Sequence, residues 1–308
     1  MGMTKRSYLH SISYSGYSYA IPSGLKTREK TIGNMQQRHN SLGIVITGGS
    51  KGLGFALAAR FLAEGDRVVL CARNGERLEA ALAALRQQVP TGEVYGIACD
   101  VADTAAPPLL AQFAVAKLGN IDRWINNAGT AGLQKRPLWQ LAGSDIAETC
   151  TTNLAGTMAM CAEAVRVMQR QPSAPQACYH IFNMGFSAVG ASFSRSAVPH
   201  KASKRGVAEI THFLARELHE AAIRSIGVHE LSPGLVLTDL LLRDAPADTR
   251  RFLQVVAQTP EAVAAVLAPK IRKVRGLNRT VRYEPLVAMV FRMVAGLPRL
   301  LRSASATS

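Results

Sequence analysis

From residue 42 onward, short apolar runs rich in β-branched side chains alternate with longer segments whose apolar residues recur every three or four positions. The short runs predict strands of a parallel sheet that is buried on both faces, and the longer segments predict amphipathic helices that cover it. The predicted strands span 42–47, 66–72, 93–99, 121–127, 177–183 and 225–231, followed by a last strand near 279–283. Because parallel strands are joined by right-handed crossovers, this order predicts an α/β fold with a doubly wound parallel sheet, Rossmann-like, in a single domain.

The predicted helices lie between these strands, and the pattern becomes less regular after Pro233. They span 54–65, 76–88, 106–119, about 143–170 and 200–222. Two further segments, 235–246 and 259–269, are expected to be helices that cap a pocket at the end of the sheet. Apolar runs such as 286–291 are far shorter than the roughly 20 residues of a membrane-spanning helix, so none is predicted.

The chain has 308 residues, of which 48% are apolar, and this is enough to bury a core. Its net charge of +15 is concentrated at the ends: residues 1–40 carry +5 and residues 269–308 carry +8, whereas 41–268 carry only +2. A nucleic-acid-binding domain would carry Lys and Arg over its folded surface, so the division argues against that class. We expect a basic, Ser- and Tyr-rich extension over 1–40, a folded domain over 41–285 and a basic amphipathic tail over 286–308.

The extension has the composition of an organelle transit segment, with six Ser residues, one acid and no apolar core of a signal peptide. A disordered extension explains the same composition equally well. The five cysteines form no C-x-x-C pair, and their odd number suits neither a disulfide framework nor a structural zinc site. The sequence therefore predicts no metal and a reducing compartment.

A glycine-rich turn follows the first predicted strand and opens a helix, which is the context in which backbone N–H groups and a helix N-terminus bind a pyrophosphate. Its residues run Thr47, Gly48, Gly49, Ser50, Lys51, Gly52, Leu53 and Gly54. A phosphate loop of the Walker A type is excluded, because no Gly-Lys-Ser or Gly-Lys-Thr closes the turn. The turn therefore favours a dinucleotide over the packing turn that glycines alone would allow.

This T-G-x-x-x-G-x-G run resembles the short-chain dehydrogenase/reductase family, and further motifs of that family follow in order across 42–240. The resemblance implies that Asp100 and Val101 contact the adenine, that Asn127-Ala128-Gly129 ends a strand beside the cofactor, and that Asn153 is the family's helix Asn. It also implies a nicotinamide-binding segment formed by Pro233, Gly234, Val236 and Thr238.

The choice of cofactor depends on the end of the second strand, where an acid would bind a free ribose 2′-OH and a base would pair with a 2′-phosphate. Arg73 stands there, and Lys51 lies in the glycine-rich turn. We therefore expect NADPH rather than NADH.

The sequence departs from the family at the catalytic centre. The family's Tyr-x-x-x-Lys pattern has His200 in the Tyr position and Lys204 in the Lys position, and Ser187 lies thirteen residues before His200, at the family's spacing for the catalytic Ser. In the family the Lys holds the nicotinamide ribose and the phenol donates a proton. An imidazole beside Lys204 is expected to be neutral at pH 7, but it still carries one N–H donor. Because the ring is about 2 Å shorter than a phenol, we expect direct donation or a bridging water, and the alternative is a weak or inactive catalyst.

Several segments, among them 94–101, 123–130, 228–242 and 259–276, resemble the chlorophyll b reductases, and this likeness spans about 43–300. It implies NADPH-dependent reduction of the 7-formyl group of chlorophyll b or chlorophyllide b to hydroxymethyl, in a chloroplast or, in a prokaryote, in the cytoplasm or on the thylakoid surface. The apolar run 240–242 and the basic tail fit an anionic thylakoid membrane, although packing of a terminal helix explains the tail equally well.

Two alternatives stay open at this point. Pocket shape rather than the shared core sets the substrate, so the chain is also compatible with a general short-chain reductase of another aldehyde or ketone. The His200 departure is compatible with a non-catalytic partner of an active paralogue, so both homo- and hetero-oligomers are considered.

Overall fold

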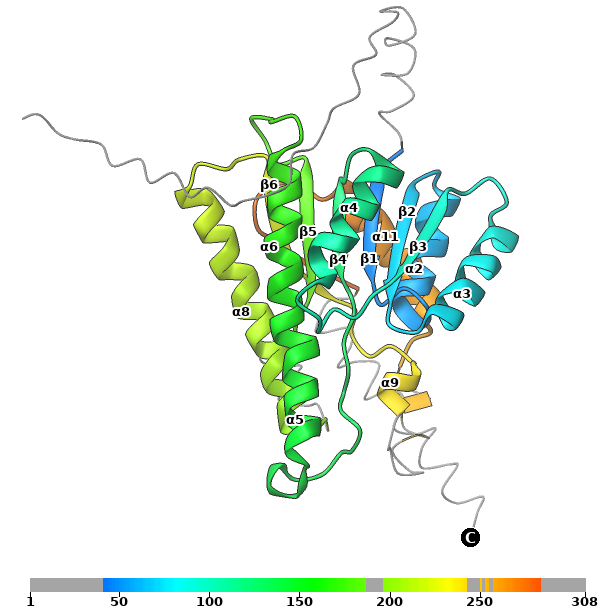
Figure 1. Ribbon diagram of the computed structural model, residues 1–308, viewed down its shortest axis with the longest axis vertical. Helices are drawn as coiled ribbons and strands as arrows, with labels where there is room; N and C mark the ends of the chain where they lie inside the picture. The colour runs from blue at the N-terminus through cyan, green and yellow to red at the C-terminus, as the bar shows by residue number, and fades with distance from the viewer. Residues whose placement is uncertain (1–40, 187–195, 243–249, 251–252, 255–256, 284–308) are drawn as a thin grey trace, which may run out of the picture. The chain divides into compact units, whose positions relative to one another are not determined.

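The computed structural model describes residues 41–186, 196–242, 250, 253–254 and 257–283. Within them, seven parallel strands form one sheet in the order β3-β2-β1-β4-β5-β6-β7 (Figure 1). The strands are β1 (Gly43–Thr47), β2 (Arg67–Ala72), β3 (Val94–Ala98), β4 (Arg123–Asn126), β5 (Tyr179–Met184), β6 (Ile226–Ser232) and β7 (Thr280–Arg282). The predicted doubly wound sheet is confirmed, including the short last strand.

Helices cover both faces of this sheet. The longer ones are α2 (Gly52–Ala63), α3 (Gly75–Gln88), α4 (Ala106–Leu118), α5 (Gly143–Cys150), α6 (Gly156–Gln169), α8 (Val198–Glu220) and α11 (Pro260–Lys273). Apolar side chains of α2, α3 and α11 form one core layer with Ile44 and Ile46, and those of α4, α6 and α8 form the other with Val45. Since β1 alternates between two buried faces, its central residues Ile44, Val45 and Ile46 are all apolar, as expected for a central parallel strand.

One helical prediction is confirmed with a local change, and another is corrected. The long helix predicted over about 143–170 is formed by α5 and α6, which are joined without a break by a π-helical turn, Thr151–Ala155. The segment predicted as a helix over 235–246 is helical only at α9 (Asp239–Leu242) within its described part. Its first residues instead form a parallel bridge between Val236 and Gln258, and the backbone N–H of Leu237 donates to the Gln258 carbonyl at 2.7 Å. These backbone groups are engaged across the chain and so cannot form helical bonds.

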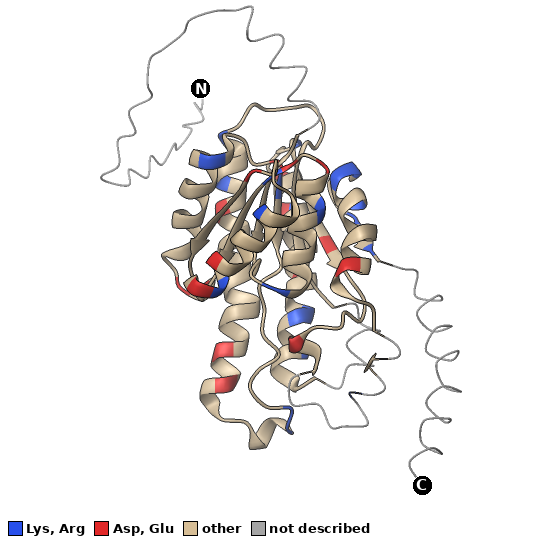
Figure 2. Ribbon diagram, turned by 90° about the vertical axis from the view of Figure 1, so that its right-hand side faces the viewer, with Lys and Arg blue, Asp and Glu red and all other residues tan. Residues whose placement is uncertain are grey.

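The described surface carries Lys and Arg interspersed with Asp and Glu (Figure 2). No helix in the described ranges is both long and apolar enough to cross a membrane. The predicted N-terminal extension, the predicted C-terminal tail and Ser187 lie outside the described residues.

Candidate active site

The candidate site lies where the carboxyl ends of the central strands meet. β1 pairs with β2 on one side and with β4 on the other, so the strand order reverses direction at β1. Open α/β sheets bind ligands outside the carboxyl ends of their strands at such a switch point. The glycine-rich turn leaves β1 at this place and opens α2.

The turn has a conformation and a packing that require glycine. Gly48 and Gly52 have φ of +68° and +59°, which side-chain-bearing residues rarely adopt. A Cβ on Gly48 would lie 2.8 Å from the Ala128 Cα, and one on Gly54 would lie 2.5 Å from the Gly48 carbonyl oxygen. The N–H groups of Gly48 and Gly49 donate to the carbonyl of Cys71 at the end of β2. The turn is thus held against its neighbours by backbone groups, and at Gly48 and Gly54 nothing larger than glycine fits.

The predicted strand-end motif is bonded to this turn. The Thr47 hydroxyl accepts hydrogen bonds from the N–H groups of Asn127 (3.1 Å) and Ala128 (3.0 Å). The Asn127 side-chain amide donates to the carbonyls of Thr47 (2.9 Å) and Gly48 (3.0 Å). Thr47 is buried, and sequence reasoning assigned it no role beyond belonging to the turn. Its hydroxyl and the Asn127 amide fix the two halves of the site to each other.

Asn153 joins the end of β4 to α8 and is fully buried. Its side-chain oxygen accepts from the Thr130 N–H at 2.8 Å, and its amide donates to the Thr130 carbonyl at 2.9 Å and to the Ser203 hydroxyl at 3.0 Å. It stands in the π-helical turn, where one extra residue per turn changes the direction of the side chains. Such turns are frequent at functional sites.

His200 and Lys204 lie one turn apart near the start of α8, and both are only 6% exposed. A Cβ on Gly129 would lie 3.1 Å from the Lys204 Nζ and 3.0 Å from the Asn153 Oδ1, so the Gly129 backbone packs closely against both groups. The Phe186 ring meets the His200 ring edge-on, with centroids 5.2 Å apart. Among the described residues, His200 Nδ1 has no hydrogen-bond partner although it is buried.

Burial sets the protonation of both groups. Burial lowers the pKa of Lys204 to about 8, so most of it is still an ammonium at pH 7. Burial, followed by the positive charges of Lys204 and Lys135, lowers the pKa of His200 to about 4. The imidazole is therefore neutral near pH 7 and has one N–H to donate, as the sequence led us to expect.

Lys135 was not found from the sequence, because it lies in a loop after β4 that belongs to no motif. Its charge acts on His200, and its Nζ donates to the Leu241 carbonyl of α9 at 3.0 Å. On the other side of α9, the Lys51 ammonium pairs with Asp239 at 2.7 Å. Two lysines thus tie α9 to the glycine-rich turn and to the loop after β4.

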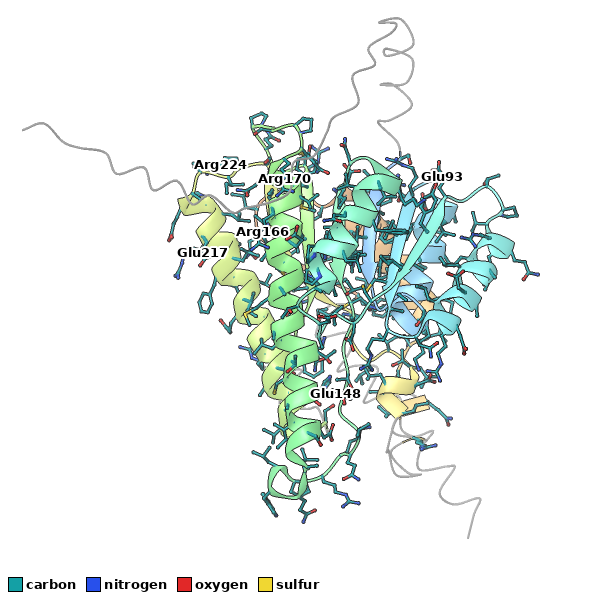
Figure 3. The ribbon with its side chains drawn as sticks, viewed as in Figure 1. Glu93, Glu148, Arg166, Arg170, Glu217 and Arg224 are labelled. Atoms are coloured by element: carbon teal, nitrogen blue, oxygen red, sulfur yellow. The ribbon has the colours of Figure 1, made fainter. Side chains whose placement is uncertain are left out.

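The expected 2′-phosphate ligands are engaged by carboxylates. Arg73 Nη1 lies 3.2 Å from Glu148 Oε1 and 3.8 Å from Asp100 Oδ2. Glu148 belongs to α5 (Figure 3). Both ion pairs are half exposed, so they are screened by solvent and weak. An anion with a higher charge than a carboxylate can therefore compete with Glu148 and Asp100 for the Arg73 guanidinium.

The remaining predicted residues line the same edge or support it from beneath. Gly234, with φ of +74°, turns the chain after β6, and the Thr238 Cγ2 lies 3.3 Å from where a Gly52 Cβ would stand. Leu53, Val101 and Val236 have side chains in the core, so they could contact a ligand mainly through their backbone. Half-buried Ser50 lies in the turn and half-buried Pro233 follows β6, whereas Ser187 is outside the described residues.

No group of His, Cys, Asp and Glu in the described ranges could hold a metal ion.

The short chain dehydrogenase family matches residues 43–248, which is most of the folded part. The chain belongs to this family. Its members are oxidoreductases that act on a carbonyl and alcohol pair with a nicotinamide cofactor.

Chlorophyll(ide) b reductases of plants are among the proteins that this chain resembles in sequence. The chain is 39% identical to the chloroplastic chlorophyll(ide) b reductase NOL of Oryza sativa subsp. japonica, over 75% of this chain and 66% of that protein. It is 37% identical to NOL of Arabidopsis thaliana, over 82% and 72%. A probable chlorophyll(ide) b reductase of Oryza sativa subsp. japonica, NYC1, is 36% identical over 78% and 49%. The chain thus spans between about half and three quarters of the length of these relatives.

Solved structures of family members have the same fold. Levodione reductase superposes with a TM-score of 0.65 and 25% identity, over 77% of this chain and 95% of that chain. A metagenomic short-chain oxidoreductase in complex with NADP has a TM-score of 0.60 and 24% identity, over 78% and 96%. The latter likeness concerns the fold alone.

Proposed function

We propose that this protein is an NADPH-dependent reductase that converts the 7-formyl group of chlorophyll b or chlorophyllide b to a hydroxymethyl group. The likeness to chlorophyll(ide) b reductases over most of the chain supports this substrate. The observation that carries the reaction is the buried pair of Lys204 and His200 on one face of α8, with the Lys204 ammonium close to Gly129 in the segment after β4. We infer that this ammonium and this neutral N–H donor would face the carbonyl oxygen as it gains charge.

The described residues fit the cofactor. The turn keeps backbone N–H groups at the N-terminus of α2, and Gly48, Gly52 and Gly54 carry no side chain there, which favours close approach of a pyrophosphate. Asp100 and Val101 would hold the adenine and Arg73, with Lys51, the 2′-phosphate. The Arg73 ion pair with Glu148 would open for this, because a phosphate offers a bidentate, charge-assisted partner.

The bound cofactor supplies a hydride to the formyl carbon. The chain's own contribution is electrostatic: the Lys204 ammonium, held close to Gly129 and Asn153, stabilises negative charge at the reacting centre. The neutral His200 ring donates its N–H toward the growing alkoxide, either directly or through a water molecule. Ser187 is proposed as a second donor. Asn153 is a positioning residue, because it bonds the strand end at Thr130 and the helix at Ser203.

The same proposal places the protein in a chloroplast, as the names of its plant relatives say of those proteins, and at the thylakoid surface. Exposed apolar side chains near the site support contact with lipid. Leu133 is 62% exposed in the loop that holds Lys135, and Trp139 is 84% exposed in the 3-10 helix Leu138–Gln140 that follows. A Trp beside basic residues is typical of an interfacial anchor. Co-sedimentation with liposomes should increase with anionic lipid, and binding that ignores lipid charge would remove the membrane proposal.

The deciding experiment incubates the purified chain with NADPH and either chlorophyll b or chlorophyllide b, and follows the pigment spectrum. Conversion to the 7-hydroxymethyl product by the wild type, with loss of conversion in Lys204→Met, supports the proposal. Oxidation of NADPH by simple carbonyl compounds without pigment conversion would indicate a general reductase. Binding of NADPH without any turnover, with co-purification of a reductase, would indicate a non-catalytic partner.

A further inference from the structure

Two cysteine thiols meet at the ends of neighbouring strands. Cys71 is the last residue but one of β2, and Cys99 follows directly after β3. Their sulfur atoms lie 2.9 Å apart, and the Cys99 N–H donates to the Ala72 carbonyl at 3.0 Å, which extends the parallel pairing of the two strands. This separation is shorter than ordinary contact between two sulfur atoms that are not bonded. The fold therefore brings together two thiols that stand 28 residues apart in the chain.

The pair lies beneath the proposed adenosine site. The Cys71 carbonyl accepts the N–H groups of Gly48 (2.8 Å) and Gly49 (3.1 Å), so it fixes the glycine-rich turn. Cys99 immediately precedes Asp100, and Arg73 follows Cys71 by two residues. A change in the distance between these two strand ends would thus move both the turn and the two residues proposed to hold adenosine.

The two thiols differ in access and in acidity. Cys71 is 1% exposed, whereas Cys99 is half buried. The contact with Cys71 lowers the pKa of the Cys99 thiol, and the same contact, together with burial, raises the pKa of the Cys71 thiol. Cys99 is accordingly the more acidic and the more accessible thiol, as expected of an attacking group, and Cys71 is the buried partner.

We propose that Cys71 and Cys99 are a modification site, where a reversible disulfide forms and weakens binding of the nicotinamide cofactor. The oxidant is a small disulfide of the glutathione class. The Cys99 thiolate attacks one of its sulfur atoms, forming a mixed disulfide and releasing one thiolate. The Cys71 thiol then loses its proton, and its sulfur attacks the Cys99 sulfur and releases the second thiolate. Two protein thiols are oxidised, one small disulfide is reduced to two thiols, and a dithiol reverses the reaction.

Closure requires the sulfur atoms to move from 2.9 Å to about 2.05 Å, which draws the ends of β2 and β3 together. The consequence for the cofactor rests on the proposed function. Because the Cys71 carbonyl holds two N–H groups of the turn, we expect the Kd for NADPH to rise about fivefold on oxidation, the size of effect that losing one hydrogen bond has.

The first experiment detects the bond itself. The full chain is treated with glutathione disulfide, remaining thiols are alkylated, and tryptic peptides are analysed by mass spectrometry with and without reduction. Cys71 falls in peptide 68–73 and Cys99 in peptide 87–117, each with no second cysteine. A reducible mass that joins these two peptides supports the proposal, and it should disappear in Cys99→Ser but persist in Cys178→Ser. Alkylation of both thiols after oxidation would overturn it.

The second experiment measures NADPH binding by fluorescence in reduced, oxidised and re-reduced protein. A Kd that rises on oxidation and recovers with dithiothreitol, in wild type and Cys178→Ser but not in Cys99→Ser, supports the effect on the cofactor. A disulfide-linked protein with an unchanged Kd would overturn that effect. If the reduced protein does not bind NADPH, the proposed function fails, while the peptide masses still decide whether the disulfide forms.

Discussion

Replacement of His200 by Tyr tests the proposed acid directly. The His200 pKa of about 4 means that about one imidazole in a thousand is charged at pH 7, so an imidazolium is almost absent as a donor. A phenol at this place reaches about 2 Å further than the imidazole, and misplacement of about 1 Å can cost a hundredfold in rate. We therefore expect His200→Tyr to raise kcat at pH 7 by about tenfold or more.

The matched control is His200→Phe, which keeps an aromatic ring against Phe186 but has no donor. The assay is the steady-state rate of NADPH-dependent pigment reduction between pH 5.5 and 9. For the wild type we expect a kcat that is flat from pH 5.5 to 7 and falls above pH 8, because Lys204 with a pKa of about 8 loses its proton there.

Two results would refute this reasoning. One is a His200→Tyr variant no faster than His200→Phe, which would mean that the position does not deliver the proton. The other is a wild-type kcat that rises tenfold for each pH unit below 7, which would identify the rare imidazolium as the donor.

Three further predictions concern the cofactor and the core. Arg73→Ala should raise the KM for NADPH about tenfold and leave the KM for NADH unchanged. Glu148→Gln should lower the KM for NADPH, because it releases the Arg73 guanidinium from its ion pair. Equal effects on both cofactors would contradict the assignment of Arg73 to the 2′-phosphate. Gly54→Ala should abolish measurable NADPH binding in calorimetry, since its Cβ would lie 2.5 Å from a backbone oxygen, and retained affinity would argue against a rigid turn. His180 and His229, buried and in contact at 2.8 Å, have pKa values lowered by burial to about 2 and about 4, so the folded state binds fewer protons than the unfolded state. Their contribution to stability is complete above pH 6.5 and is lost as the pH falls toward 4, by about 1.4 kcal/mol per pH unit for each ring. The free energy of unfolding measured in urea should therefore depend less steeply on pH in His180→Asn than in the wild type. An unchanged slope would refute the linkage.

The sequence by itself determined the sheet and the outline of the site. Central parallel strands are rich in apolar residues, so the Ile44-Val45-Ile46 run of β1 was readable without the fold, and so was the turn that follows it. The motif residues Asn127, Asn153 and Lys204 also came from the sequence, because the family fixes their order and spacing. Their proposed roles stay predictions.

Tertiary structure alone decided which distant groups meet. Arg73 pairs with Glu148 across 75 residues, and the Cys71 and Cys99 thiols meet across 28. Lys135 reaches α9 from a loop without periodicity. Asn153, in the π-helical turn, bonds Thr130 and Ser203, which lie in other parts of the chain. Local periodicity records only which face of an element is buried, whereas contacts between elements depend on strand order, register and crossovers, and these exist only once the chain has folded.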